Sequence, residues 1–299
     1  MDNDAWLQIS FEVTGEQAEV VAEVLSRYAN QGVAIEQDLQ SKNQKSVKVY
    51  AYLLVDDALE EKKLEIEKAI FHLNQIMPIP EPTYQQIRNQ DWMAAWKKFY
   101  EPVSVGDKLR VIPAWEKLKE KNFRIPIRIN PGMAFGTGTH PTTQLSLELM
   151  ERYLLPGQSM IDVGCGSGIL SIAGILLGAS HALAVDISQA SVQSSLENCQ
   201  LNNVADKFEI GKGSVTEIRN GEFSIQKAPI VVANIILKVQ MDIFAQGLTD
   251  LVSDGGRLII SGILIDQVEA IQELAQKDGF VQTDIIIQDD WAGVAFRKE

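Results

Sequence analysis

From residue 142 onward, short apolar runs rich in β-branched residues alternate with stretches of helical periodicity. A strand that is apolar throughout must be covered on both faces, so this alternation predicts a parallel sheet with helices on either side. The pattern is typical of an α/β, Rossmann-like domain. The expected strands are 160–163, 182–185, 208–210, 230–233 and 258–260.

The C-terminal end breaks this alternation. Residues 283–288 and 294–298 are both strand-like and flank a turn that contains Trp291, which predicts an antiparallel hairpin. A hairpin that closes a parallel sheet is unusual in nucleotide-binding folds. We therefore expect a mostly parallel sheet that ends in an antiparallel hairpin.

The N-terminal segment has a different order of elements. Residues 1–88 contain a strand, a helix, two strands, a helix that stops at a proline cluster, and an edge strand. This order predicts a small α+β domain, the ferredoxin-like split βαβ unit. We expect three parts: this domain over 1–88, a linker helix and short strand over 89–113, and the Rossmann-like domain over 114–299.

Net charge restricts the partners of the chain. It is −13 over 299 residues, which argues against general affinity for nucleic-acid phosphates. Residues 1–88 hold 15 acidic and 8 basic side chains, so a basic partner suits this segment, with plain solubility as the open alternative. No apolar stretch approaches the roughly 18 residues of a membrane span and no secretory signal is visible, so we expect a soluble, cytoplasmic protein.

Cysteine and histidine are too few and too scattered for a metal site. Cys165 and Cys199 are the only cysteines, and the histidines are His72, His140 and His181. Neither set has the number or the spacing that a zinc site or a disulfide framework requires. We therefore expect no bound metal.

A glycine-rich segment lies at the junction of a predicted strand and a predicted helix. Ile161–Gly168 reads I-D-V-G-C-G-S-G, and glycines there let the backbone turn tightly and let a ligand approach the peptide groups. A dinucleotide-binding loop would need its third glycine at the position of Ile169. The observed spacing, with Asp162 two residues before Gly164, is typical of S-adenosylmethionine loops; an ordinary turn is the alternative.

Two later strands end in polar side chains. Asp186 follows Gly166 by 20 residues, where its carboxylate can accept hydrogen bonds from both ribose hydroxyls. Asn234 ends the fourth strand, where its amide oxygen can accept a hydrogen bond from an amine and align the nitrogen lone pair for in-line methyl transfer. The structural alternatives are a helix-terminal carboxylate for Asp186 and a helix cap for Asn234.

The loop Asn130–Thr143 is rich in glycine and threonine and precedes a helix that Pro141 can begin. Met133 and Phe135 between its glycines would be costly to expose in a plain connector, so the pattern favours a ligand-covering loop over a flexible linker.

The loop 130–143, the glycine loop 162–168 and the turn 234–237 together closely resemble the PrmA family, methyltransferases of protein eleven of the large ribosomal subunit. The resemblance covers nearly the whole chain. It implies a Rossmann-like S-adenosylmethionine-dependent methyltransferase domain behind an N-terminal domain that recognises the ribosomal protein. It also implies methylation of lysine side chains and of the N-terminal α-amine. A lysine amine has a reference pKa of about 10.4 and must lose its proton before it reacts. We expect this proton to be lost to solvent, with His140 as the alternative base.

Carried over by position, the resemblance implies cofactor binding by Thr143, Gly164, Asp186 and Asn234, with Gly166 in the same glycine loop and Asn234 also at the reacting amine. Two alternatives stay open: a non-catalytic S-adenosylmethionine-binding module, and an enzyme of the same fold that acts on a small molecule or a nucleic-acid base. Base methyltransferases of this fold carry Pro-Pro and an aromatic ring after the Asn or Asp, whereas Ile-Ile-Leu follows here. We therefore expect no direct nucleic-acid partner.

Overall fold

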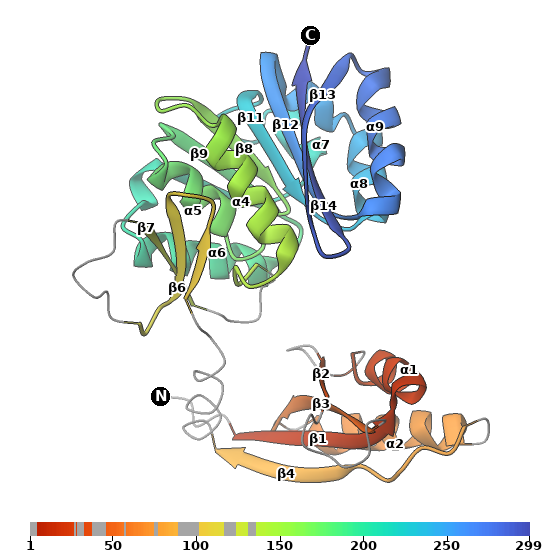
Figure 1. Ribbon diagram of the computed structural model, residues 1–299. Coiled ribbons are helices and arrows are strands. Elements are labelled where there is room, and N and C mark those ends of the chain that lie inside the picture. The colour runs from red at the N-terminus through yellow and green to blue at the C-terminus, as the bar shows by residue number, and fades with distance from the viewer. Residues whose placement is uncertain are drawn as a thin grey trace. The chain divides into compact units, whose positions relative to one another are not determined.

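In the computed structural model the chain forms two compact units, residues 1–100 and 101–299 (Figure 1). The predicted linker helix over 91–100, and Met133 and Phe135 of the predicted ligand-covering loop, lie outside the described residues. The structure describes residues 5–26, 28, 33–37, 46–56, 58–74, 77–88, 102–116, 124–130 and 136–299.

The first unit has the element order that the sequence predicts for residues 1–88. Its four strands form one antiparallel sheet in the order β2-β3-β1-β4, which is the order expected of a ferredoxin-like unit. Side chains at alternate positions of β1, such as Ile9, Phe11 and Val13, are buried in the core that this sheet forms with its helices. The elements are β1 (Ala5–Thr14), α1 (Gly15–Ser26), β2 (Val33–Gln37), β3 (Ser46–Leu54), α2 (Leu59–Asn74) and β4 (Thr83–Arg88).

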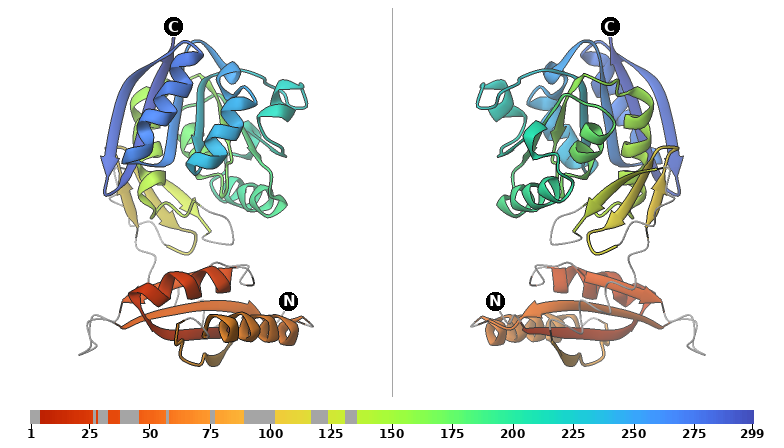
Figure 2. Two further views of the ribbon diagram at one scale, coloured as in Figure 1. Left: turned by 90° about the vertical axis from the view of Figure 1, so that its right-hand side faces the viewer. Right: turned by 90° about the vertical axis from the view of Figure 1, so that its left-hand side faces the viewer.

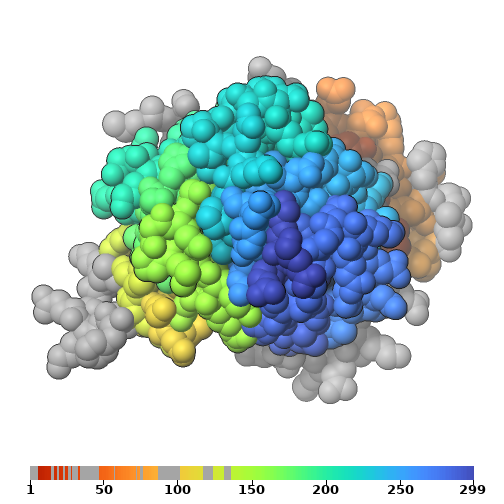
Figure 3. Space-filling view, turned by 90° about the horizontal axis from the view of Figure 1, so that it is seen from above, coloured from red at the N-terminus to blue at the C-terminus, as the bar shows by residue number. Residues whose placement is uncertain are grey.

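The second unit is built on a seven-stranded sheet in the order β10-β9-β8-β11-β12-β14-β13. The first five strands are parallel and the last two form an antiparallel hairpin, so the predicted fold class is confirmed. Figure 3, a view from above, shows the end of β14 in dark blue, bordered by other segments of this unit. The strands are β8 (Ser159–Val163), β9 (His181–Asp186), β10 (Phe208–Lys212), β11 (Ala228–Asn234), β12 (Val252–Leu264), β13 (Phe280–Gln288) and β14 (Trp291–Lys298).

Helices cover both faces of this sheet (Figure 2). Neighbouring side chains of β8 point to opposite faces: Met160 joins the core under α4, α5 and α6, whereas Ile161 joins the core under α7, α8 and α9. This two-sided burial is the reason that the strands are apolar throughout. The helices are α4 (Pro141–Tyr153), α5 (Ile169–Leu176), α6 (Gln189–Leu201), α7 (Val215–Arg219), α8 (Leu237–Ala245) and α9 (Val268–Lys277).

A separate three-stranded sheet, in the order β5-β6-β7, packs against α4, α5 and α6 through the first of these cores. It consists of β5 (Val103–Val105), β6 (Leu109–Pro113) and β7 (Ile125–Ile129). Residues 103–113 were predicted to belong to a linker, but β5 and β6 fall within the second unit, where β6 pairs with β7. Among the described residues, no helix is long and apolar enough to cross a membrane.

Candidate functional site

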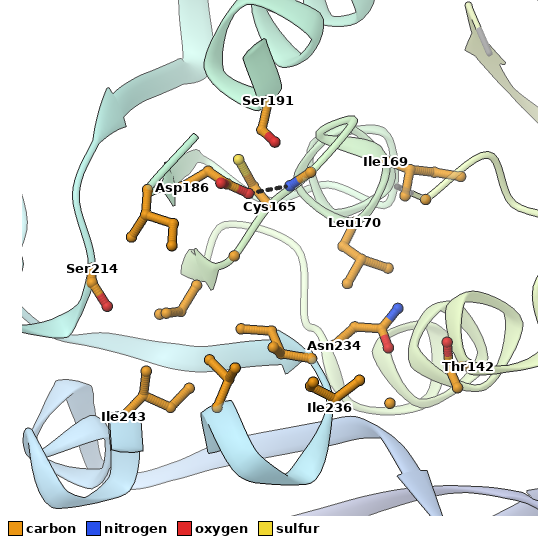
Figure 4. A pocket seen from close by; sticks show the side chains of 18 of the residues that line it. Thr142, Cys165, Ile169, Leu170, Asp186, Ser191, Ser214, Asn234, Ile236 and Ile243 are labelled. Atoms are coloured by element: carbon orange, nitrogen blue, oxygen red, sulfur yellow. Dashed lines mark hydrogen bonds between the residues drawn. The ribbon is translucent and has the colours of Figure 1, made fainter. Parts of the chain in front are cut away.

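A cavity of about 420 Å³ lies at the carboxyl edge of the parallel strands (Figure 4). The chain runs outward from β8 through β9 to β10 and returns to place β11 on the other side of β8, so the strand order reverses at this point. Ligands of open α/β sheets bind at such a reversal. Most of the wall is apolar, and its polar contributors are His140, Thr142, Cys165, Asp186, Ser191, Ser214 and Asn234.

The glycine loop forms one wall of the cavity. Gly164, Gly166 and Gly168 have φ values of 75°, 54° and 78°, the left-handed region that favours glycine. A Cβ at Gly164 would also lie only 2.5 Å from the Ile235 side chain. The loop therefore needs its glycines both for its backbone conformation and for the close approach of the turn after β11.

Asp186 lies beside this loop, at the end of β9, the strand that pairs with β8. Its Oδ2 accepts the Gly166 N–H at 3.0 Å, drawn as a dashed line in Figure 4, and its Oδ1 accepts the Ser188 N–H at 2.8 Å. Because a carboxylate has about four acceptor positions, these two bonds leave others for a ligand. Helix α6 has Ser188 as its own N-cap, so capping does not explain Asp186.

Asn234 ends β11 at the opposite end of the cavity, near Thr142 and Ile236 in Figure 4. Its Nδ2 donates a hydrogen bond to Thr143 Oγ1 at 3.4 Å. Its Oδ1 is buried and accepts no hydrogen bond from any residue that the structure describes. A buried acceptor left unpaired costs about 1–3 kcal/mol, so this oxygen favours a ligand that brings an N–H or O–H donor. Helix α8 begins after Ile236, so Asn234 is not its cap.

Thr143 is the one predicted cofactor residue that does not line the cavity. Its side chain is fully buried and its hydroxyl contacts Asn234, while the neighbouring Thr142 forms part of the wall. Gly164, Gly166, Asp186 and Asn234 are all brought to the cavity. Thr143 therefore lies behind the wall, where it accepts a hydrogen bond from Asn234.

His140 is the N-cap of α4 and also lines the cavity. Its Nδ1 accepts the Thr142 N–H at 3.3 Å and lies 2.8 Å from the Thr142 hydroxyl. Burial lowers the pKa of His140, which favours the neutral ring. A neutral ring whose Nδ1 accepts carries its proton on Nε2, so neither nitrogen is a free proton acceptor. This geometry argues against His140 as the general base.

Two residues at the site were not predicted to belong to it. Trp291, at the start of β14, lines the cavity, and its ring lies edge-on to His140 with centroids 5.0 Å apart. Gln240 of α8 is fully buried and lies behind the wall. Its Nε2 donates to the backbone carbonyls on either side of Asn234, Ala233 at 3.1 Å and Ile235 at 3.2 Å. Gln240 thus fixes the backbone that carries Asn234.

Asp162 is buried beneath the glycine loop. Its Oδ2 accepts hydrogen bonds from the backbone N–H of Ser171 at 3.2 Å and from the Ser171 hydroxyl at 2.8 Å. Burial raises the pKa of Asp162 to about 7, and the nearby charge of Asp186 adds to this rise. A cation bound in the cavity would favour the ionised form of Asp162.

These residues fit S-adenosylmethionine. Asp186 can accept hydrogen bonds from ribose hydroxyls, and the glycine loop presents peptide groups without Cβ atoms. Ile187 and Ile243 supply an apolar wall for the adenine ring. The unpaired oxygen of Asn234 lies at the other end, where a reacting amine could donate to it. We call the Asp186 side of the cavity its binding end and the Asn234 side its reacting end, after the roles proposed below.

Proteins of one family match this chain over nearly its whole length. The sequence model of the family described as "Ribosomal protein L11 methyltransferase (PrmA)" matches residues 5–299. Ribosomal protein L11 methyltransferases of Chloroflexus aurantiacus and Listeria innocua are 33% and 32% identical, over 100% and 98% of this chain and 99% and 98% of theirs.

A solved structure supports the same assignment. The ribosomal protein L11 methylase of Lactobacillus delbrueckii subsp. bulgaricus matches with a TM-score of 0.60 and 32% identity, over 67% of this chain and 100% of its own. The resemblance that the motifs indicated is confirmed, and S-adenosylmethionine is the methyl donor of this family. This chain belongs to the PrmA family of S-adenosylmethionine-dependent methyltransferases.

Proposed function

We propose that this protein methylates amino groups of ribosomal protein L11, both lysine side chains and the N-terminal α-amine. The names of its relatives support the protein substrate. The observation that carries the choice of an amine is the buried, unpaired Oδ1 of Asn234 at the reacting end of the cavity. An amine nitrogen can donate one N–H to this oxygen and keep its lone pair directed elsewhere.

S-adenosylmethionine, when bound, supplies a methyl group on a sulfonium ion. Gly164, Gly166 and Asp186 would hold its nucleoside part. Asn234 then orients the amine so that its lone pair faces the methyl carbon, which raises the rate through positioning. The apolar cavity wall disfavours the charged ammonium form, because desolvation lowers the pKa of an amine.

The proton of the amine leaves to solvent before the amine enters the cavity. His140, the candidate base in the loop, has its Nδ1 occupied by Thr142. The ring of Trp291 lies beside His140 and covers the same end of the cavity, so both residues act as walls for the incoming amine. The rings of His140 and Trp291 also favour contact with the aliphatic part of a lysine side chain over contact with water.

The N-terminal domain over 1–88 is the part that recognises the ribosomal protein. Its 15 acidic and 8 basic residues give this segment an excess of seven negative charges. A basic protein partner is attracted to such a segment, whereas nucleic acid is repelled. A ribosomal-protein substrate also places the reaction in the cytoplasm.

The test is to incubate the purified chain with methyl-labelled S-adenosylmethionine, purified ribosomal protein L11 and total nucleic acid, and to locate the label. We expect the label on L11, as N-methylated lysine and N-methylated α-amine after acid hydrolysis. With S-adenosylmethionine well below its Kd, Asp186→Ala should transfer about thirtyfold less label. Label on nucleic acid alone, or on carboxylate side chains of L11, would contradict the proposal.

A further inference from the structure

Helix α6 carries polar side chains on the face that packs against the rest of the unit. Ser195 and Asn198 lie in α6 and Asn202 is its C-cap, and their three- and four-residue spacing places them on one side of the helix. Ser195 and Asn198 are fully buried. Most buried polar groups are hydrogen bonded, so the partners of these side chains show what the helix holds in place.

One set of partners is the glycine loop. Ser195 Oγ donates to the carbonyl of Gly166 at 2.9 Å, and Asn198 Nδ2 donates to the carbonyl of Ser167 at 2.9 Å. Two consecutive carbonyls of the loop are thus fixed from behind. The N–H of Gly166 points the other way and donates a hydrogen bond to Asp186 in the cavity.

The other set of partners is the free edge of β7, the outer strand of the three-stranded sheet. The side-chain amide of Asn202 accepts the Arg128 N–H at 2.8 Å and donates to the Arg128 carbonyl at 2.6 Å. Asn198 Oδ1 accepts the N–H of Asn130, two residues further on, at 2.8 Å. The Asn202 amide thus bonds to the edge of β7 as a neighbouring strand would, and Asn198 bonds to the residue that directly follows β7.

Of the three side chains, Asn198 alone bonds to both the glycine loop and the end of β7. Its two roles need an amide, because one partner is a carbonyl and the other is an N–H. Ser167 adds a second tie, since its hydroxyl donates to the Gly136 carbonyl at 2.6 Å. The glycine loop is therefore joined to Asn130 and to Gly136, both of which belong to the segment before α4.

We propose that Asn198 is a positioning residue for the methyl donor: it fixes the Ser167 carbonyl and so holds the glycine loop in the conformation that binds the nucleoside. The inference rests on the placement of the nucleoside at Gly164 and Asp186 that is proposed above. It assigns to α6 a part in cofactor affinity, although neither Asn198 nor Asn202 lines the cavity.

The experiment compares Asn198→Leu with Asn202→Leu in the full chain. Each variant removes one amide that bonds to β7, but only the first removes a bond to the glycine loop. Titration calorimetry with S-adenosylmethionine should give a Kd about tenfold higher for Asn198→Leu, equivalent to about 1.4 kcal/mol. Asn202→Leu should stay within about twofold of the unaltered chain. In turnover assays, Asn198→Leu should raise KM for S-adenosylmethionine and change kcat little.

Loss of packing alone would lower the melting temperature of both variants and the fraction of active protein, without a selective change in Kd. An unchanged Kd for Asn198→Leu, or an equal rise for Asn202→Leu, would overturn the proposal. If Asn198→Leu does not fold, Asn198→Asp decides, because it keeps the acceptor for Asn130 and loses the donor to Ser167. Asp186→Ala in the same titration separates the two hypotheses: wild-type affinity there would refute the cofactor site itself.

Discussion

The two ends of the cavity are built differently. At the Asp186 end, both carboxylate oxygens accept backbone N–H groups, at 3.0 Å and 2.8 Å, and the loop that faces them is held from behind by α6. At the Asn234 end, the amide nitrogen makes one long bond of 3.4 Å and the amide oxygen is buried without a partner. One end is hydrogen bonded within the protein, and the other leaves an acceptor to a ligand.

This difference separates affinity from rate. Groups that are already fixed add to binding because little ordering remains to be done when the ligand arrives. A group that gains its partner only when the amine is in place contributes to the reaction step instead. Substitutions at the two ends should therefore change different kinetic constants.

Asn234→Ala should give the largest effect. Without the amide oxygen the amine is no longer aligned, and misplacement by about 1 Å costs roughly a hundredfold in rate. We expect kcat for L11 methylation to fall by about that factor, and the Kd for S-adenosylmethionine to rise only a few-fold. Single-turnover kinetics and calorimetry measure the two quantities separately.

Asn220→Ala is the matched control for that variant, because Asn220 is exposed at the end of α7. It should leave both constants unchanged. A loss of binding for Asn234→Ala as large as its loss of rate would remove the distinction between the two ends of the cavity.

Asp186→Ala should change cofactor binding rather than the rate of the reaction step. Hydrogen bonds to a charged group contribute about 1.5–3 kcal/mol, so we expect the Kd for S-adenosylmethionine to rise about thirtyfold. At saturating cofactor, kcat should be close to that of the unaltered chain. Asp206→Ala, an exposed aspartate before β10, is the control. A reduced kcat at saturation would place Asp186 in the reaction step.

Gln240→Leu tests whether the reacting end depends on its support. The substitution removes the donor to the Ala233 and Ile235 carbonyls, so Asn234 loses its fixed backbone. We expect kcat to fall about tenfold with little change in cofactor Kd, less than for Asn234→Ala because the amide itself remains. The exposed Gln193→Leu should have no effect. A rise in the cofactor Kd as large as the fall in kcat would indicate general destabilisation.

The binding end of the cavity was predictable from sequence, because its residues follow strands whose apolar runs are easily recognised. Parallel strands end at one edge, so Gly166 and Asp186 had to lie close together, and they are hydrogen bonded. Asn234 was placed by the same reasoning. The extent of β12 was not predictable in this way: its start at Val252 lies before Gly255, a residue that is typical of turns.

The support of the reacting end was not predictable, because it depends on contacts between distant parts of the chain. A lone glutamine in a helix, such as Gln240, has no pattern that distinguishes a buried side chain from an exposed one. Trp291 was expected in a hairpin turn, but its approach to His140 depends on how β14 pairs with β12. The inward face of α6 also required the structure, since its polar residues contradict the usual amphipathic pattern.

His140→Asn should give the smallest effect, and its pH dependence distinguishes a wall from a base. Burial lowers the pKa of His140 in the folded chain, so below the unfolded pKa of about 6.5 the unfolded state binds more protons. The unaltered chain should then lose stability as the pH falls below about 6.5, and His140→Asn, which can still cap α4, should lose less in chemical denaturation at each pH. The pH profile of kcat should be the same for both proteins, because Nδ1 already accepts the Thr142 N–H. A missing or shifted limb in that profile would make His140 the base and would place a proton acceptor at the reacting end.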